Sequence, residues 1–250
     1  MGTVIYLIER SITMLKQDLI SRNPLRLIAG PGQPILSEGE FGAVVARAGV
    51  GKTAFLVQVA MDSLLSGKNV LHISLDQPVK KVCLWYEEVF NAITNEYDFK
   101  NTTSLWEEIL PHRFIMTFKS RDFSIDTLEE RITDLVEQGI FYPQICLIDG
   151  LHFDETVREL LSEMKLLSRD QGFPCWFSIR THRDESRTSQ GMPDRVAQVA
   201  DLFEVIFELA PSMNEVGIKI LKDVHERLGD IRKRPDVVLD PATFLMKKIA

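Results

Sequence analysis

The chain has 250 residues, of which 45% are hydrophobic and 26% charged, and its net charge at pH 7 is −7. This length and composition are typical of one large globular α/β domain. The acidic balance argues against binding nucleic acid through overall charge, although a local basic loop can still bind it.

The apolar runs are too short to indicate a secretory leader or a membrane-spanning helix. The three cysteines, Cys83, Cys146 and Cys175, lack metal-ligand spacing, and two of them lie in apolar runs. We therefore expect a cytoplasmic protein with no membrane partner, in which the cysteines are small core residues.

Residues 1–22 are predicted to form an amphipathic helix that precedes the main domain. Between residues 4 and 20, one helical face collects the apolar residues Ile5, Ile8, Ile12, Leu15 and Leu19. A linker rich in Pro and Gly then leads into the domain, which is expected over residues 23–250. The helix either packs on its own domain or serves as an oligomerisation arm that docks on a neighbouring subunit.

The stretch Ala46–Thr53 (ARAGVGKT) has the pattern of a phosphate-binding loop, except that Ala46 stands where the first glycine is usual. An apolar run over residues 41–45 precedes it and a helical pattern over residues 53–65 follows, as this motif requires. The glycines let successive backbone N–H groups face a polyphosphate at the N-terminus of a helix. The alternative is a plain glycine turn followed by an exposed lysine.

We therefore predict a site for ATP and Mg²⁺. The residues expected to bind the nucleotide are Ala48, Gly49, Val50, Gly51, Lys52, Thr53 and Ala54. In this site Lys52 reaches the β- and γ-phosphates, and the Thr53 hydroxyl binds Mg²⁺.

Beyond the loop, apolar runs alternate with helical patterns, which is typical of a mostly parallel sheet with helices on its faces. Strands are expected at residues 70–75, 114–118, 145–148 and 175–179. Two helices are predicted, one begun by an Asp126-x-x-Glu129 cap and one with its apolar face between Val157 and Leu167.

After about residue 200 the helical patterns stop. Four runs are expected to be consecutive strands that extend the sheet in antiparallel fashion, at residues 202–209, 216–221, 237–239 and 244–246.

Two aspartates end buried runs of this predicted sheet. Asp149 follows the run 145–148, at the strand end where ligands bind in open α/β sheets, and is expected to hold Mg²⁺ with Thr53. Asp76 ends the run 70–75 at the same edge and is the candidate for orienting the attacking water. A solvated strand end is the alternative for Asp149, and a helix cap before Pro78 is the alternative for Asp76.

A polar stretch follows the strand expected at 175–179. Arg180 and His182 are candidates for contacting the γ-phosphate, and an ordinary polar loop is the alternative. The longer stretch from Arg180 to Arg195 contains four arginines and a histidine offset by three acids, so its support as a nucleic-acid-binding loop is weaker.

In the order of these motifs the chain resembles the RecA-like P-loop ATPases, and within them the branch of KaiC-like proteins and DnaB-type helicases. The likeness covers residues 36–247. It includes the loop over residues 46–54, Ser74-Leu75-Asp76, Leu147-Ile148-Asp149 and the closing stretch Leu239–Thr243. The resemblance implies a RecA-like fold, with a mostly parallel central sheet flanked by helices and an antiparallel C-terminal extension.

The resemblance also implies ATP hydrolysis in a homo-oligomer, with a hexameric ring as one form, whose sites are completed by Lys or Arg fingers from a neighbour. Lys222 matches the lysine position, and Arg227 is near enough to replace the arginine that is absent at Val224. Two departures concern hydrolysis. Asp76 stands where the family usually has a glutamate, and the glutamine expected near residues 179–183 is missing.

Two functions are compatible with these features. The first is a slow ATPase whose cycle remodels a nucleic-acid or protein partner. The second is a regulatory, ATP-sensing KaiC-like module with little or no turnover, which the shorter Asp76 and the missing glutamine would permit. A small-molecule kinase fits less well, because the C-terminal strands resemble the ATPase family more than a kinase lid.

Overall fold

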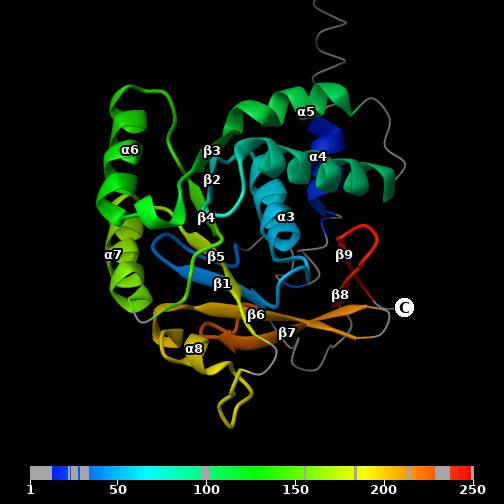
Figure 1. Ribbon diagram of the computed structural model, residues 1–250. Coiled ribbons are helices and arrows are strands. Elements are labelled where there is room, and N and C mark those ends of the chain that lie inside the picture. Colours follow the sequence, from blue (N-terminus) through cyan, green and yellow to red (C-terminus); the bar gives the residue numbers. More distant parts are fainter. Residues whose placement is uncertain are drawn as a thin grey trace, which may run out of the picture.

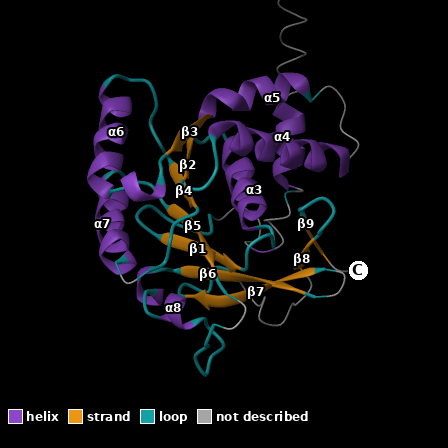
Figure 2. Ribbon diagram, viewed as in Figure 1, coloured by secondary structure: helices purple, strands orange, loops and turns teal. Residues whose placement is uncertain are grey.

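The computed structural model describes residues 13–21, 23, 28, 34–96, 102–154, 156–182, 185–212, 215–228 and 237–248. Within these residues, nine strands form one sheet in the order β3-β2-β4-β5-β1-β6-β7-β8-β9 (Figure 1). Helices cover both faces of the sheet (Figure 2).

The strands are β1 (Phe41–Ala46), β2 (Val70–Ser74), β3 (Arg113–Thr117), β4 (Ile145–Asp149), β5 (Cys175–Arg180), β6 (Val205–Pro211), β7 (Val216–Asp223), β8 (Val237–Leu239) and β9 (Met246–Lys248). The α-helices are α3 (Lys52–Leu65), α4 (Val79–Glu96), α5 (Thr103–Ile109), α6 (Ile125–Glu137), α7 (Val157–Asp170) and α8 (Asp194–Ala197). Short 3₁₀ turns lie at Leu110–His112, Ser120–Asp122 and Ala200–Leu202.

The fold class predicted from the sequence is confirmed at the level of architecture. The first six strands in spatial order, β3 to β6, pair in parallel, and β7, β8 and β9 add in antiparallel fashion. The four central strands β2, β4, β5 and β1 are almost wholly buried. Strands buried on both faces form continuous apolar runs, which explains why these four could be recognised in the sequence.

The predicted C-terminal extension needs two corrections. The strand expected at 202–209 pairs in parallel with β1 and antiparallel only with β7, so the antiparallel extension starts at the β6–β7 pair. This strand begins at Val205, after the 3₁₀ turn Ala200–Leu202. The last strand begins at Met246 rather than at Phe244, whose φ of 56° belongs to a left-handed turn and not to a strand.

The predicted helices also differ in detail. The cap of α6 is Ser124, whose side chain accepts a hydrogen bond from the Thr127 N–H, and Asp126 lies inside the first turn. Helices α4 and α5 had no counterpart in the sequence analysis. The buried residues of α4 nevertheless recur at helical spacing, at Val82, Tyr86, Val89 and Ile93, and this signal could have revealed it.

The core has two halves, one on each face of the sheet. One half packs α3, α4 and α5 against the sheet, and the other packs α6 and α7 against the opposite face (Figure 2). The described part of the N-terminal segment, residues 13–21, is helical and belongs to the first half. Leu19 is buried there, and the Lys16 ammonium lies 2.8 Å from the Glu108 carboxylate at the end of α5.

These contacts place residues 13–21 on their own domain. Residues 1–12, to which the rest of the predicted helix belongs, lie outside the described part of the chain, as does most of the linker. None of the helices that the structure describes is both long and apolar enough to span a membrane.

Candidate functional site

The loop between β1 and α3 makes a tight turn whose shape depends on two glycines. Gly49 has a φ of 77° and Gly51 a φ of 111°, both in the region that side chains other than glycine rarely adopt. A Cβ atom on Gly51 would also lie 2.5 Å from Leu239 Cδ2 in β8. The Gly51 carbonyl accepts the Phe55 N–H at 2.9 Å, so the helix begins directly after the loop.

Lys52 lies at the first position of α3 with its ammonium turned back into the loop. Its Nζ donates to the Ala46 carbonyl at 3.1 Å and to the Arg47 carbonyl at 3.0 Å. Burial lowers the pKa of Lys52, Asp149 and Asp76 act against this decrease, and Arg180 adds to it. The ammonium is therefore partly desolvated, and a bound anion would stabilise its charged form.

Asp149 is the buried carboxylate of the site, with only 6% of its surface exposed at the end of β4. The Thr53 hydroxyl donates to Asp149 Oδ2 at 2.7 Å, and the Ser178 hydroxyl makes a short hydrogen bond to Oδ1. Ser178 Oγ in turn accepts the Gly150 N–H at 3.0 Å. Two hydroxyls from α3 and β5 thus fix the carboxylate against the loop, and sequence analysis had given Ser178 no role.

These groups open into a pocket of about 430 Å³ at the carboxyl ends of the parallel strands. Among the residues predicted from the sequence, the pocket brings together Ala48, Gly49, Gly51, Lys52, Thr53, Asp76, Asp149 and Arg180. It is further lined by residues that the sequence analysis did not single out: Gln77, Lys81, Trp85, Gly150, Leu151, His152, Ser178 and Phe244.

Asp76 lines the same pocket and is more exposed than Asp149. Its side chain packs directly over Gly150, where a Cβ atom would come within 2.8 Å of both Asp76 Cγ and Oδ2. His152 Nε2 lies 3.8 Å from Asp76 Oδ1. Because Gly150 has no side chain, the Asp76 carboxylate can occupy this position in the pocket.

Two aromatic rings form another wall. Trp85 from α4 and Phe244 from the β8–β9 turn meet edge to face, with ring centroids 5.5 Å apart. The fully buried Gln58 of α3 holds this turn through two hydrogen bonds of 2.8 Å, to the Phe244 carbonyl and from the Met246 N–H. Gln58 and Phe244 are 186 residues apart in the sequence, so no local sequence pattern predicts that Phe244 is part of the site.

Three of the residues predicted to contact the nucleotide do not line the pocket. Val50 packs against the core, and Ala54 is fully buried in α3. Each could therefore contact a nucleotide only through its backbone. His182 is exposed, and its backbone N–H donates to Glu185 Oε2 at 3.1 Å. Of the two candidates for contacting the γ-phosphate, the structure thus places Arg180 at the pocket and His182 outside its lining.

The two residues predicted as fingers toward a neighbour are engaged within their own chain. Lys222 Nζ donates to the Ala200 carbonyl at 2.5 Å. Arg227 forms a fork with Glu40, with Nη1–Oε2 at 2.5 Å and Nη2–Oε1 at 3.0 Å. Each would have to break these bonds to reach another subunit.

The stretch after β5 that was weighed as a nucleic-acid loop is partly neutralised by internal pairs. Arg187 donates to the Glu208 carboxylate at 2.5 Å and to the Gly191 carbonyl at 2.7 Å. Arg180 faces the pocket, and Arg183 lies outside the described residues. Arg195 is exposed, so Arg187 is the arginine of this stretch whose charge is balanced by an ion pair among the described residues.

Comparisons with known proteins do not identify the chain: no protein-family model matches it, and no curated protein matches it significantly. Its function must therefore be argued from the pocket.

Proposed function

We propose that the chain is a RecA-like P-loop ATPase that binds ATP with Mg²⁺ in the pocket beneath the 46–53 loop. The observation that carries this proposal is the convergence of Lys52, Thr53 and Asp149 at the N-terminus of α3. A partly desolvated ammonium beside a helix N-terminus favours a polyphosphate. The strand–loop–helix connection supports the same ligand.

The residues present fit a magnesium ion. The Thr53 hydroxyl and the Asp149 carboxylate already lie 2.7 Å apart, and both offer the oxygen ligands that Mg²⁺ prefers. Bound there, the metal would neutralise charge on the phosphates. Ser178 holds the carboxylate in place while its Oδ2 atom faces Thr53.

A nucleoside rather than a bare phosphate is supported by the aromatic wall. Trp85 and Phe244 offer ring surfaces to the pocket, and Phe244 lies beside the loop, where a Cβ atom on Gly51 would be 3.4 Å from its Cδ1 atom. Flat apolar rings pack favourably against a nucleobase. The pocket volume of about 430 Å³ lies within the usual range for small-molecule sites.

Hydrolysis is assigned to Asp76 and Arg180. Asp76, which lines the pocket together with Lys52, orients the attacking water, while Arg180 stabilises negative charge that develops on the phosphates. Because the Asp76 side chain is one methylene shorter than a glutamate, turnover is expected to be slow. We further propose a homo-oligomer in which this cycle remodels a nucleic-acid or protein partner.

The deciding experiment measures ATP binding and steady-state hydrolysis by the parent, Lys52→Ala and Lys68→Ala, with and without single-stranded DNA. Lys52→Ala should lose at least about tenfold in ATP affinity, because its ammonium pairs with phosphate oxygens. Lys68 is exposed after the end of α3, and its variant should match the parent. An unchanged affinity in Lys52→Ala would remove the basis of the proposal. Stimulation by DNA would identify nucleic acid as the partner.

A second function, an ATP-sensing module with little turnover, is favoured by one observation: Asp76 is short, exposed and packed on Gly150. The parent would then bind ATP tightly without hydrolysing it, and Asp76→Asn would change nothing. A measurable parent rate that falls at least about tenfold in Asp76→Asn would instead support the ATPase.

A further inference from the structure

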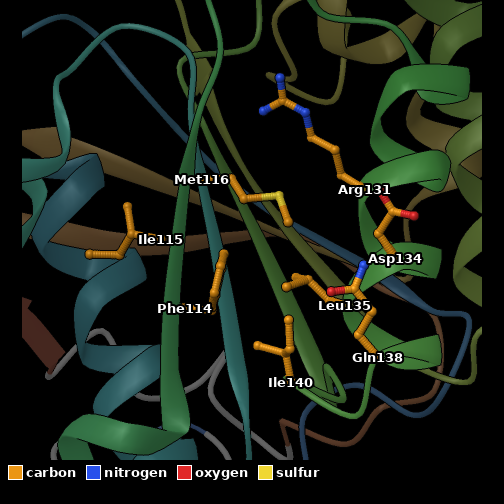
Figure 3. A pocket seen from close by; sticks show the side chains of 8 residues that line it. All are labelled: Phe114, Ile115, Met116, Arg131, Asp134, Leu135, Gln138 and Ile140. Atoms are coloured by element: carbon orange, nitrogen blue, oxygen red, sulfur yellow. The ribbon is translucent and has the colours of Figure 1, made fainter.

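Two hollows of similar volume differ in the chemistry that their side chains offer. The groove between β3 and α6, of about 360 Å³, is mainly apolar, and side chains such as Phe114, Leu135 and Ile140 converge on it (Figure 3). No histidine, cysteine or hydroxyl-bearing side chain is among the described residues that line this groove. The pocket beneath the 46–53 loop, in contrast, is lined by His152, a residue that the proposed function does not use.

His152 lies in the connection between β4 and α7, where the residues on either side of it are fixed. Leu151 and Phe153 are each only 7% exposed and belong to the core half that contains α6 and α7. Asp154 Oδ1 accepts the Thr156 N–H at 3.0 Å and the Thr156 hydroxyl at 2.7 Å, directly before α7 begins. The backbone of His152 is thereby held in place, while its side chain lines the pocket and is 67% exposed.

The imidazole lies beside Asp76, the carboxylate proposed to orient the attacking water. His152 Nε2 is 3.8 Å from Asp76 Oδ1, and the His152 ring makes no hydrogen bond to the described residues. This separation is too long for a direct hydrogen bond, but one water molecule can bond to both atoms at about 2.8 Å. The two side chains are therefore spaced to hold a single water between them.

An imidazole also supplies what Asp76 lacks as a base. Imidazoles are stronger bases than carboxylates and are the most frequent proton acceptors in catalysis. A carboxylate next to the imidazole stabilises the imidazolium that forms when the proton is transferred. Asp76 is well placed for this second task, since Asp154, the acid two residues after His152, is already bonded to Thr156.

We propose that His152 accepts a proton from the attacking water, which Asp76 holds and orients; this inference rests on the proposed ATPase function. The water oxygen forms a bond to the γ-phosphorus. The bond from that phosphorus to the oxygen bridging the β- and γ-phosphates breaks, and its electron pair stays with ADP. The water proton moves to Nε2, and the imidazolium then releases it to solvent, to which the ring is exposed.

The test compares kcat and ATP affinity in the parent, His152→Ala, His152→Gln and the control Glu159→Ala. Both His152 variants should lower kcat at least about tenfold and keep the ATP affinity of the parent, because the imidazole acts on the water. Glutamine can accept a hydrogen bond from water but cannot take its proton, so His152→Gln should be as slow as His152→Ala. Glu159 is exposed in the first turn of α7, outside the pocket lining, and its variant should match the parent.

Added imidazole distinguishes proton transfer from a structural role of His152. The ring removed in His152→Ala leaves space that free imidazole can enter from solvent, since the side chain is 67% exposed. Imidazole should therefore raise the kcat of His152→Ala in a saturable manner. It should leave His152→Gln unchanged, because the glutamine side chain fills that space. A defect in the shape of the loop would not respond to imidazole in either variant, and that result would overturn the proposal.

The Lys52→Ala variant separates failure of this inference from failure of the proposed function. If Lys52→Ala binds ATP as the parent does, the ATP site and the role of His152 are both wrong. If ATP binding depends on Lys52 but the His152 variants keep the parental kcat, or lose ATP affinity instead, only the role of His152 is overturned. A parent that binds ATP without hydrolysing it has the same meaning, since the imidazole then takes no proton.

Discussion

At the scale of single residues, the two glycines of the 46–53 loop are constrained for different reasons. Both have positive φ, but a Cβ atom on Gly49 would meet no atom within 4 Å, whereas on Gly51 it would lie 2.5 Å from Leu239 Cδ2. Gly49→Ala should therefore cost about 1 kcal/mol of backbone strain, and Gly51→Ala about 1–3 kcal/mol more because the core residue Leu239 must also move.

Urea unfolding of the two variants and the parent measures this difference, and circular dichroism checks that the fold is retained. Equal losses of stability would mean that the loop relaxes away from β8, contrary to the packing described here.

His72 provides a second prediction at this scale. It is fully buried in β2, where its Nδ1 hydrogen-bonds the Tyr86 hydroxyl at 3.0 Å and its Nε2 has no hydrogen-bond partner among the described residues. Burial lowers its pKa from 6.5 to about 4. Since the unfolded chain binds this proton more readily, stability is fully present above pH 6.5 and is lost as pH falls toward 4.

The loss through His72 should be on the order of 3 kcal/mol, from a difference of about 2.5 pKa units at about 1.4 kcal/mol each. His72→Gln should flatten the dependence of unfolding free energy on pH between 4 and 6.5. The exposed His182→Gln is the control and should retain the slope of the parent. If the unfolding free energy of His72→Gln depends on pH as steeply as that of the parent, groups other than His72 cause the loss of stability in acid.

At the scale of elements, the link between α3 and the β8–β9 turn joins the two ends of the site. Gln58 accepts the Met246 N–H and donates to the Phe244 carbonyl, both at 2.8 Å. Gln58→Leu keeps the volume but leaves two backbone groups unpaired, which should cost about 2–4 kcal/mol. ATP affinity should also fall, because this turn positions Phe244 in the pocket.

Ser63→Ala is a suitable control for Gln58→Leu, since Ser63 also lies in α3 but bonds only within the helix, to the Val59 carbonyl. Calorimetric unfolding and ATP titration of both variants separate the effects. A Gln58→Leu protein that loses stability but binds ATP as the parent does would show that Phe244 contributes nothing to the site.

How well the elements could be predicted from the sequence depended on how local their signals are. The strands over residues 41–46, 70–74 and 145–149 are buried on both faces, so continuous apolar runs identified them. The loop residues were found because the phosphate-loop spacing is itself local. The direction of β6 could not be found, because it depends on pairing with β1, about 160 residues earlier in the chain.

The aromatic wall shows the same limit within the site. Trp85 lies on a helix with a readable apolar face, yet its neighbour Phe244 is held by Gln58 across 186 residues of sequence. Ser178 became part of the site only because β5 and β4 are adjacent in the sheet. Contacts of this kind follow from strand order, which no local pattern encodes.

At the scale of the whole molecule, Arg227 and Glu40 connect the segment after β7 to the start of β1, 187 residues apart. Burial acts to raise the pKa of Glu40, but the hydrogen bond and charge of Arg227, with help from Ser37 and His225, lower it overall. The fork therefore contributes stability above pH 4.5, and that contribution is lost as the pH falls below 4.5.

Arg227→Lys should cost about 1–3 kcal/mol near neutral pH, since one ammonium cannot replace a partly buried two-bond fork. The control is Arg158→Lys, whose fork with Asp201 is exposed and should contribute no more than about 1 kcal/mol. Urea unfolding at pH 7 and below pH 4.5 measures both, and the deficit of Arg227→Lys should shrink at the lower pH. If Arg227 instead acted only on the ATP site of a neighbouring subunit, the opposite pattern is expected. Arg227→Lys would then lower ATP turnover and leave the free energy of unfolding at its parental value.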